Sequence, residues 1–247
     1  MPATTLVVPC YNEAERLDVE AILEFADRCP EIGFLFVDDG SRDATWEVLT
    51  RLRDSRPGAI EACRLERNAG KAEAVRAGIL AALDRSPRYV GYWDADLATP
   101  LSEAIQLIGV LDDDEGVAGV IGSRVRMLGR SIQRRPTRHL AGRIFATLTS
   151  LVLGMNVYDT QCGAKLFRSS AAVRQVFLKP FLSPWAFDVE ILARLMTSGN
   201  PTVVEYPLRE WRHVSGSKIR VVDCIRIPMD LLRIYCRYSC CSAERRS

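Results

Sequence analysis

The sequence has few of the residues on which metal centres and nucleophilic sites often depend. It contains two histidines, and its eight cysteines are scattered along 247 residues without the paired short spacings of a zinc site. The cysteines also lack the density of a secreted disulfide scaffold, so we expect reduced thiols in a cytosol. The two histidines, His139 and His213, exclude a His-rich metal centre and provide no evident nucleophilic triad.

Long apolar runs are missing as well. A membrane-spanning helix needs about 20 mostly apolar residues, whereas the best candidate, Ile144 to Tyr158, is shorter and includes several polar side chains. The chain starts without a basic region, a long apolar segment or a small-residue cleavage site, so no export signal is expected. The glycine motifs with which nucleoside triphosphatases and dehydrogenases bind phosphate are also absent.

The composition is that of an ordinary globular protein, with 48% hydrophobic and 26% charged residues and enough length for one large core. The net charge of +2 is unevenly distributed, because the stretch between Gly116 and Asp159 contains seven arginines and no acidic residue. We expect this stretch to attract phosphates or an acidic lipid surface. It lacks interleaved aromatic residues, and this absence, together with the small net charge, argues against nucleic-acid binding.

Strand-like apolar segments alternate with helical periodicity through the first half of the chain. The predicted strands are Thr4–Val8, Gly33–Val37, Ile60–Arg64, Tyr89–Trp93 and Val117–Ile121. The predicted helices between them are Glu15–Arg28, Ala44–Arg53, Lys71–Leu83 and Leu101–Leu111. This alternation predicts βαβ units and therefore an α/β fold with a mainly parallel central sheet flanked by helices.

The second half is less regular. The predicted elements are a helical stretch Pro136–Leu153, a strand Thr160–Phe167, an amphipathic helix Trp185–Met196 and a strand Thr202–Tyr206. In the tail, Val221–Tyr238, one helical face carries Val222, Ile225, Met229, Leu232 and Cys236. Such a helix can lie in a membrane interface, or it can pack on the domain with its arginines in water. We expect one domain over residues 1–220 and an amphipathic helix with its tail over residues 221–247.

Polar motifs follow each of the first four predicted strands. They are Pro9-Cys10-Tyr11-Asn12-Glu13, Asp38-Asp39-Gly40-Ser41, Asn68-Ala69-Gly70-Lys71 and Asp94-Ala95-Asp96. Open α/β sheets bind ligands at the carboxyl ends of their strands, so these motifs should meet at one rim. Two carboxylates separated by one residue, Asp94 and Asp96, can hold a divalent cation against a phosphorylated ligand.

These four motifs, in this order and spacing, resemble those of family 2 glycosyltransferases with the GT-A fold. Further segments, Asp159–Phe167, Trp185–Glu190 and Ser215–Lys218, look like the dolichyl-phosphate β-glucosyltransferase branch, so that the resemblance covers nearly the whole chain. It implies inverting transfer of a hexose, with UDP-glucose as the favoured donor, to a polyprenyl phosphate. It also implies Mg²⁺ or Mn²⁺ as cofactor and a cytoplasmic protein placed peripherally on the cytosolic face of an anionic membrane.

The resemblance also assigns candidate site residues. Those implied in nucleotide-sugar binding are Pro9, Tyr11, Glu13, Val37, Asp39, Lys71, Asp94, Ala95, Asp96 and Arg124. Those implied in contacts with phosphate or acceptor are Arg124, Arg212, Lys218 and Gln161. Asp94 and Asp96 are the expected metal ligands, with Asp96 the first choice. Related mannosyl enzymes carry Gln two positions after the second Asp, where this chain has Ala98, and this departure favours glucose over mannose.

The catalytic candidates are Asp96, Asp188 and Asp159. A phosphate monoester has a second pKa near 6 and is mostly ionised at pH 7, so it needs orientation more than deprotonation. We therefore keep Asp159 and Asp188 as candidates either for acceptor positioning or for a base, and Cys162 is not expected to act as a nucleophile.

Two other functions stay open at this stage. The first is a family 2 transferase that acts on a soluble glycan or small molecule and needs Asp188 as a true base. The second is a sugar-nucleotide-binding protein without turnover. The sequence leaves the nucleobase, the sugar and the oligomeric state open.

Overall fold

The computed structural model describes residues 2–133, 145–151, 153–154, 156–198, 201–214 and 221–238. Within them a seven-stranded sheet, of strand order β3-β2-β1-β4-β7-β5-β8, forms the centre of the molecule. Its strands are β1 (Thr4–Cys10), β2 (Ile32–Asp38), β3 (Ile60–Arg64), β4 (Tyr89–Trp93), β5 (Val117–Ser123), β7 (Ala164–Arg168) and β8 (Thr202–Pro207). All pairs are parallel except those of β7, which runs antiparallel to β4 and β5. The predicted α/β fold with a mainly parallel sheet is confirmed.

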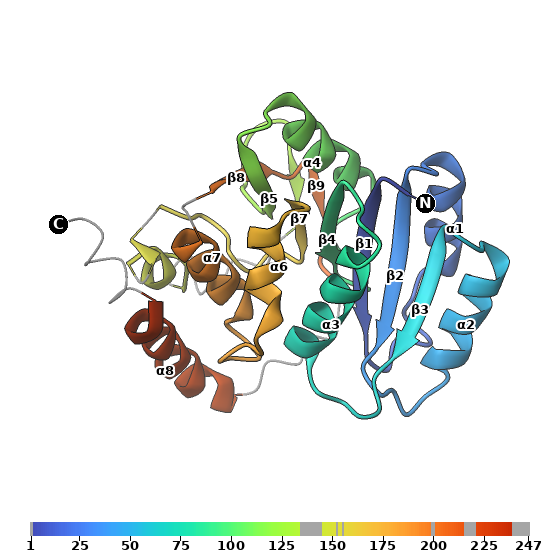
Figure 1. Cartoon of the computed structure of the whole chain (residues 1–247), viewed down its shortest axis with the longest axis horizontal. Helices are drawn as coiled ribbons and strands as arrows, with labels where there is room; N and C mark the ends of the chain where they lie inside the picture. Colours follow the sequence, from blue (N-terminus) through green and yellow to red (C-terminus); the bar gives the residue numbers. More distant parts are fainter. Residues whose placement is uncertain are drawn as a thin grey trace.

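Helices cover both faces of this sheet (Figure 1). One face packs against α1 (Val19–Arg28), α2 (Thr45–Ser55) and α4 (Ser102–Asp113). The other packs against α3 (Lys71–Leu83), α6 (Ala171–Leu178) and α7 (Phe187–Thr197). In β1, Leu6 and Val8 point into the first core and Val7 into the second, because successive side chains of a strand alternate between faces. A strand buried on both faces therefore reads as a continuous apolar run.

Two predicted boundaries differ from the structure for local reasons. The first helix starts at Val19 and not at Glu15, because the Asp18 side chain caps it by accepting a hydrogen bond from the amide of Ala21. The predicted strand Thr160–Phe167 is wrong over its first half. Residues 160–163 turn, and the strand starts at Ala164.

Helix α7 was predicted to be amphipathic, and this is wrong. Every residue from Phe187 to Leu195 is buried, including Asp188, Glu190 and Arg194. One side of α7 packs into the core shared with α3 and α6, and the other side packs against α8 (Val221–Tyr238). The charged residues on α7 are buried because this second layer covers the side that the sequence pattern assigned to water.

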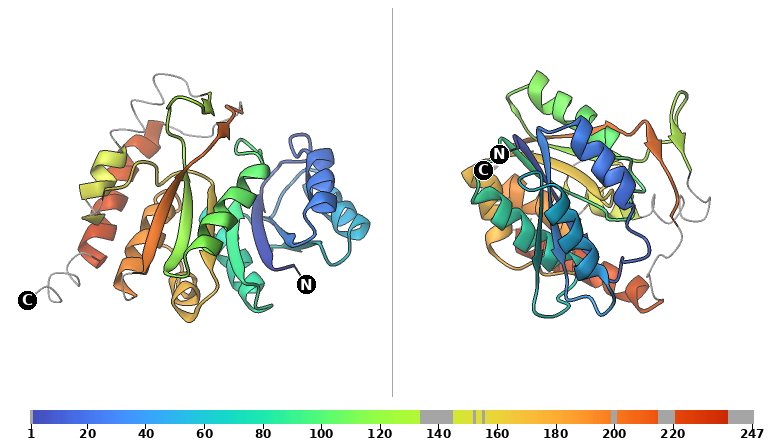
Figure 2. Two further views of the ribbon diagram at one scale, coloured as in Figure 1. Left: turned by 90° about the horizontal axis from the view of Figure 1, so that it is seen from above. Right: turned by 90° about the vertical axis from the view of Figure 1, so that its right-hand side faces the viewer.

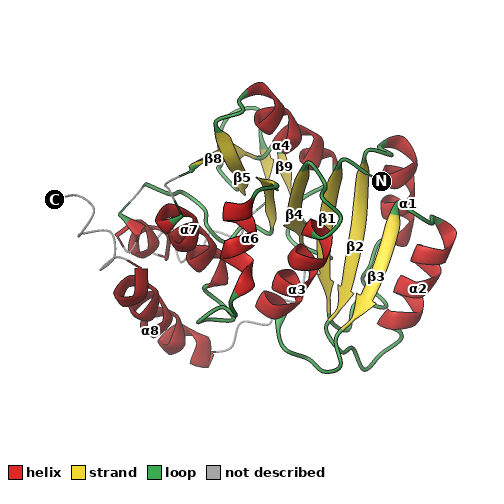
Figure 3. Ribbon diagram, viewed as in Figure 1, coloured by secondary structure: helices red, strands yellow, loops and turns green. Residues whose placement is uncertain are grey.

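The remaining elements lie around the end of the sheet that contains β7, β5 and β8 (Figure 3). Helix α6 and a two-stranded parallel sheet, β6 (Ser131–Ile132) with β9 (Glu210–Trp211), were not predicted. Of the predicted helical stretch Pro136–Leu153, residues 145–151 are helical, and residues 136–144 lie outside the described residues. The left view of Figure 2 places α8 at the end of the molecule away from α1 and α2.

Candidate active site

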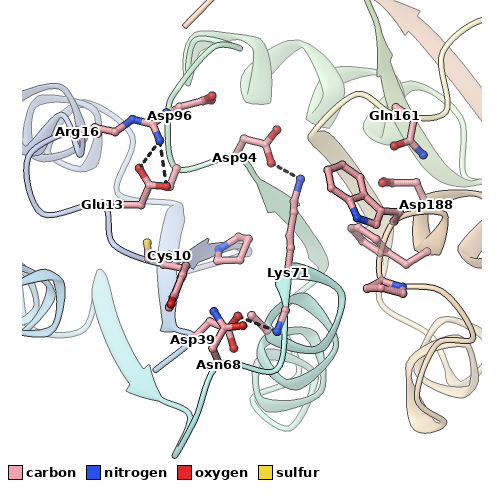
Figure 4. Close-up of a pocket in the computed structure, with 18 residues that line it drawn as sticks. Cys10, Glu13, Arg16, Asp39, Asn68, Lys71, Asp94, Asp96, Gln161 and Asp188 are labelled. Atoms are coloured by element: carbon pink, nitrogen blue, oxygen red, sulfur yellow. Dashed lines mark hydrogen bonds and ion pairs between the residues drawn. The ribbon is translucent and has the colours of Figure 1, made fainter. Parts of the chain in front are cut away.

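A cavity of about 510 Å³ opens where the parallel strands β1, β2 and β4 end. The predicted site residues that line it are Pro9, Tyr11, Glu13, Asp39, Lys71, Asp94, Ala95, Asp96, Gln161 and Asp188. They come from segments far apart in the sequence, and Figure 4 shows their side chains around one space. The carboxyl ends of neighbouring parallel strands meet at one rim, so the motifs that follow these strands converge there.

The other predicted site residues do not line this cavity. Val37 is fully buried in the core beneath it. Arg124 and Asp159 pair with one another, and Arg212 is exposed and pairs with Glu210. Lys218 lies outside the described residues.

Asp94, at the end of β4, forms an ion pair with Lys71, the first residue of α3. The Lys71 Nζ to Asp94 Oδ1 distance is 2.6 Å, and the two side chains are 41% and 34% exposed (Figure 4). Desolvation raises the pKa of Asp94, but the charge of Lys71 and its hydrogen bond outweigh this effect, so the net pKa lies below the usual value. An ammonium group and a carboxylate thus share the middle of the cavity.

Asp96 lies two residues further along the same loop, at the end of the cavity where Glu13 and Arg16 are found (Figure 4). One of its oxygens accepts a hydrogen bond from the amide of Ala98 at 3.1 Å. Desolvation, and then the negative charge of Asp94, raise the pKa of Asp96. A carboxylate whose ionised form is disfavoured in this way gains from a nearby cation.

Asp39 organises the loop that leads into α3. Its two oxygens accept hydrogen bonds from the amides of Ala69 at 2.7 Å and Gly70 at 2.8 Å. Burial raises the pKa of Asp39, and these two amide bonds partly offset the rise. The predicted contact with a nucleobase stays a prediction and would use the remaining lone pairs of this carboxylate.

Arg124 and Asp159 form a buried bidentate pair behind the cavity. Arg124 Nε donates to Asp159 Oδ2 at 2.6 Å, and Nη2 donates to Oδ1 at 2.7 Å. The guanidinium also lies 5.4 Å from the ring centre of Trp211. The predicted contacts of Arg124 with phosphate and of Asp159 with the acceptor stay predictions, since in this arrangement the two side chains satisfy one another.

Asp188 lies at the opposite wall, in the first turn of α7. Its Oδ1 accepts hydrogen bonds from Lys165 Nζ at 2.6 Å and from the Tyr92 hydroxyl. Cys162, next to Gln161, is fully buried, and desolvation raises its pKa to about 11. A thiol with this pKa carries very little thiolate at neutral pH.

Sequence reasoning assigned no role to several residues that line the cavity. They are Cys10, Arg16, Asn68, Gly70, Ala74, Pro184, Trp185 and Phe187. Pro184, Trp185 and Phe187 belong to the loop and first turn of α7, so they form the wall beside Asp188. The Trp-Ala-Phe-Asp segment was recognised as part of the family resemblance, and its two aromatic residues close to Asp188 were the available signal that the segment lines the cavity.

The carboxylates of the cavity fit a divalent cation that is bound partly by the protein and partly by a phosphorylated substrate. Mg²⁺ is usually held by one or two carboxylates, with substrate phosphates and waters completing its coordination. Asp94 and Asp96 provide this number of carboxylates on one loop. In the described part of the chain, no three His, Cys, Asp or Glu side chains are grouped so that they could hold a metal by themselves.

Comparisons with known proteins agree with this geometry. The family profile described as Glycosyl transferase family 2 matches residues 5–174. A dolichyl-phosphate beta-glucosyltransferase, ALG5C, of Trichomonas vaginalis is 35% identical over 243 residues, which cover 94% of this chain and 70% of the relative. The dolichyl-phosphate beta-glucosyltransferase of Drosophila melanogaster is 33% identical and is covered to 74%, with 95% of this chain.

Solved structures show the same fold at low identity. Glucosyl-3-phosphoglycerate synthase from Mycobacterium tuberculosis, crystallised with Mn²⁺, UDP-glucose and phosphoglyceric acid, matches with a TM-score of 0.62 and 18% identity. The match covers 94% of this chain and 79% of that chain. These structural neighbours are GT-A glycosyltransferases, and the predicted GT-A fold is therefore confirmed. The profile covers most of the chain and the sequence relatives exceed 30% identity, so this chain belongs to glycosyl transferase family 2 and is a glycosyltransferase.

Proposed function

We propose that this enzyme transfers glucose from UDP-glucose to a polyprenyl phosphate of the dolichyl phosphate type, with inversion at the anomeric carbon. The observation that carries the proposal is that one cavity brings together Asp94, Asp96, Lys71 and Asp188. Relatives named dolichyl-phosphate beta-glucosyltransferase support the acceptor class. A structural neighbour crystallised with UDP-glucose supports the donor.

The donor diphosphate would lie at the rim of β1 and β4. Asp96 and Asp94 would hold Mg²⁺ or Mn²⁺ there, and the cation would supply positive charge to the departing diphosphate. Lys71 adds a second positive charge within reach of the same phosphates, because its flexible side chain can exchange Asp94 for a phosphate oxygen. Tyr11, Pro9 and Asp39 would surround the nucleoside.

The acceptor would enter on the side of α7. An oxygen of its phosphate forms the new bond to the anomeric carbon while the bond from this carbon to the diphosphate oxygen breaks. The nucleophile is already mostly ionised at neutral pH. Asp188 would line the acceptor end of the cavity and orient the acceptor there, and Trp185 would pack against the sugar.

The outer side of α8 is a surface that could contact the membrane in which a lipid acceptor lies. Met229 and Leu232 are 53% and 61% exposed, and Arg233 and Arg237 are exposed beside them. Leu148 and Leu151, on the neighbouring segment 145–151, are also exposed. None of the helices within the described residues combines the length and apolarity needed to cross a bilayer. We propose peripheral contact of this surface with the anionic cytosolic face of a membrane.

The proposal is tested with purified protein, polyprenyl phosphate, Mg²⁺ or Mn²⁺, and either UDP-glucose or GDP-mannose, with lipid-linked product read by mass spectrometry. We expect a lipid-linked hexose with UDP-glucose, much less with GDP-mannose, and none after addition of a chelator. Asp96→Asn should reduce transfer by about 100-fold or more, since it weakens charge stabilisation at the leaving group. No lipid-linked sugar with any donor would overturn the proposal.

A soluble acceptor is the second candidate, and one observation favours it. The structural neighbour from Mycobacterium tuberculosis was crystallised with phosphoglyceric acid, a water-soluble compound. An alcohol acceptor would need Asp188 as a base. Transfer to a soluble phosphorylated alcohol that is abolished in Asp188→Asn, with no transfer to polyprenyl phosphate, would make this candidate preferable.

A further inference from the structure

Lys165 is a fully buried lysine in the interior of the central sheet. It lies on β7, the strand that runs antiparallel between β4 and β5, and none of its surface is exposed. Lysine is almost never buried unless its charge is paired. Lys165 does not line the cavity, so neither the sequence motifs nor the cavity itself assigned it a role.

The ammonium group of Lys165 makes three contacts. Nζ donates to Asp188 Oδ1 at 2.6 Å and to the carbonyl oxygen of Cys162 at 2.5 Å. It also lies 5.1 Å from the ring centre of Tyr92. The hydroxyl of Tyr92 donates to the same Oδ1 of Asp188.

Both of these side-chain hydrogen bonds to Asp188 fall on one oxygen. Oδ1 is therefore engaged on the side of the sheet, and among the described residues no side-chain donor is bound to Oδ2. Asp188 itself lines the cavity, on the wall opposite Lys71 (Figure 4). Two donors on one oxygen fix the rotation of the carboxyl group, which leaves the second oxygen for a ligand in the cavity.

We infer that Lys165 is a positioning residue, which acts with Tyr92 to hold Asp188 at the acceptor end of the site. The inference deepens the proposed function and rests on it, because it assigns how the acceptor-side carboxylate is placed. Lys165 touches neither substrate. It acts through Asp188. Its hydrogen bond to the carbonyl oxygen of Cys162 also connects it to the segment that contains Gln161.

A merely structural ion pair is the alternative explanation, and the same helix provides a matched control for it. Glu190 is two residues after Asp188, is fully buried, and pairs with Arg194 at 2.7 Å. This pair does not line the cavity. Glu190 also accepts a hydrogen bond from the amide of Leu182 at 2.7 Å, which a glutamine oxygen can still accept. Glu190→Gln therefore removes the charge from a buried ion pair on α7 and keeps this contact with the α6–α7 loop.

The experiment compares Lys165→Met, Tyr92→Phe, Asp188→Asn, the double variant K165M/D188N and the control Glu190→Gln. Lys165→Met leaves the buried carboxylate of Asp188 without its partner and can therefore prevent folding. The double variant removes both charges, and Tyr92→Phe removes none. These two variants keep the test possible if Lys165→Met does not fold. Folding is checked by thermal unfolding. Steady-state transfer is measured below the unfolding range of every variant.

We expect Lys165→Met to lower kcat by about 10- to 100-fold and Tyr92→Phe to lower it less, as for a misplaced catalytic group. The KM for the sugar nucleotide should change by less than about twofold, because the donor end is untouched. K165M/D188N should have the kcat of Asp188→Asn alone, since Lys165 acts through Asp188. Glu190→Gln should lower the unfolding temperature and leave kcat unchanged.

Three kinetic results would overturn the inference. They are a wild-type kcat in both Lys165→Met and Tyr92→Phe, a kcat of K165M/D188N that falls by the product of the single effects, or an equal loss of kcat in Glu190→Gln. A crystal structure of Tyr92→Phe gives a readout without activity, in which Asp188 should adopt a second rotamer. An unchanged rotamer there contradicts the inference, whereas absent lipid product in the wild-type protein contradicts only the proposed acceptor.

Discussion

Gly163 makes the closest approach in the site. A Cβ at this position would lie 1.9 Å from Asp94 Oδ2, and the Gly163 carbonyl accepts a hydrogen bond from the amide of Asp94 at 3.0 Å. The loop before β7 thus packs directly on the carboxylate that faces Lys71. Only a residue without a side chain leaves Asp94 in its place.

We predict that Gly163→Ala displaces Asp94 and lowers transfer by about 100-fold, because even a shift of 1 Å is costly at a catalytic group. Gly109→Ala is the matched control. Gly109 lies inside α4 with open space around it, so alanine should keep activity and stabilise the helix by about 0.5–1 kcal/mol. Binding of UDP by calorimetry and steady-state transfer would measure the difference, and normal UDP binding by Gly163→Ala would contradict this prediction.

The Asp94 and Lys71 pair leads to a pH-dependent contribution to stability. The pKa of Asp94 is lowered by Lys71, and the pKa of Lys71 is raised because the charges of Asp94 and Asp188 outweigh desolvation. A carboxyl group whose pKa is lower in the folded protein than in the unfolded chain stabilises the fold at pH values above its unfolded pKa. This stabilisation is lost as the pH falls through the folded pKa. A lysine whose pKa is higher in the folded protein than in the unfolded chain stabilises the fold at pH values below its unfolded pKa. This stabilisation is lost as the pH rises through the folded pKa.

We therefore predict that wild-type protein exceeds Lys71→Met in free energy of unfolding between about pH 5 and pH 10, and that the difference disappears beyond either end. The difference should stay below about 1 kcal/mol, because both side chains are more than a third exposed and water screens the pair. Urea unfolding at a series of pH values measures it. A difference that grows as the pH falls below 4 would have the wrong sign.

At the scale of elements, the loop between α6 and α7 depends on α8. The Ser183 hydroxyl donates to Asp230 Oδ2 at 2.7 Å and accepts hydrogen bonds from the amides of Trp185 and Ala186. Ser183 is fully buried. One hydrogen bond therefore links α8 to the wall of the cavity that contains Trp185.

We predict that Ser183→Ala destabilises the protein by about 1–3 kcal/mol, because the buried Asp230 carboxylate and two amides lose a partner. It should also raise the KM for the acceptor, since Trp185 loses its support. Arg233→Ala is the control: Arg233 pairs with the other oxygen of Asp230 but is 63% exposed, so its loss should cost about 0–1 kcal/mol. Equal unfolding free energies for the two variants would disprove the prediction.

At the scale of the whole molecule, the exposed apolar residues of α8 face away from the packed core. Leu231 and Ile234 are buried against α7, while Met229, Leu232 and Tyr235 are exposed. Three of the residues in the predicted apolar stripe, Met229, Leu232 and Cys236, are thus on the outside. Leu231 and Ile234 form the face of α8 that packs on the core, so the apolar residues on its exposed face are available to a further partner.

We predict that vesicles with anionic lipid bind the protein and that the double change Met229→Ser with Leu232→Ser weakens binding by about 30-fold, which is about 1 kcal/mol for each partly buried side chain. Ile105→Ser, on α4 at the other face of the sheet, should bind as the wild type does. Flotation at low and high salt measures both, and salt should weaken binding through the arginines. Equal binding of all three proteins would contradict the proposed lipid surface.

The sequence by itself determined the alternation of strands and helices and the rim at which the site lies. Apolar periodicity and turn residues act locally, so the boundaries of β3, α3 and β4 could be predicted to the residue. The motifs at Asp39, Lys71 and Asp94 converge because parallel strands end at one rim. Local signals did not fix every boundary, since α1 starts at Val19 after the cap at Asp18 and was predicted from Glu15.

Tertiary structure alone decided which polar groups pair and which helix faces are covered. Asp188 meets the hydroxyl of Tyr92, 96 residues away, and Arg124 meets Asp159 behind the cavity instead of facing it. Helix α7 is buried on all sides because α8 adds a second layer. Such contacts depend on how distant elements stack, and a buried lysine such as Lys165 has no local pattern that distinguishes it from an exposed one. The reason is that burial and charge pairing are set by long-range packing, while sequence periodicity reports only the local path of the chain.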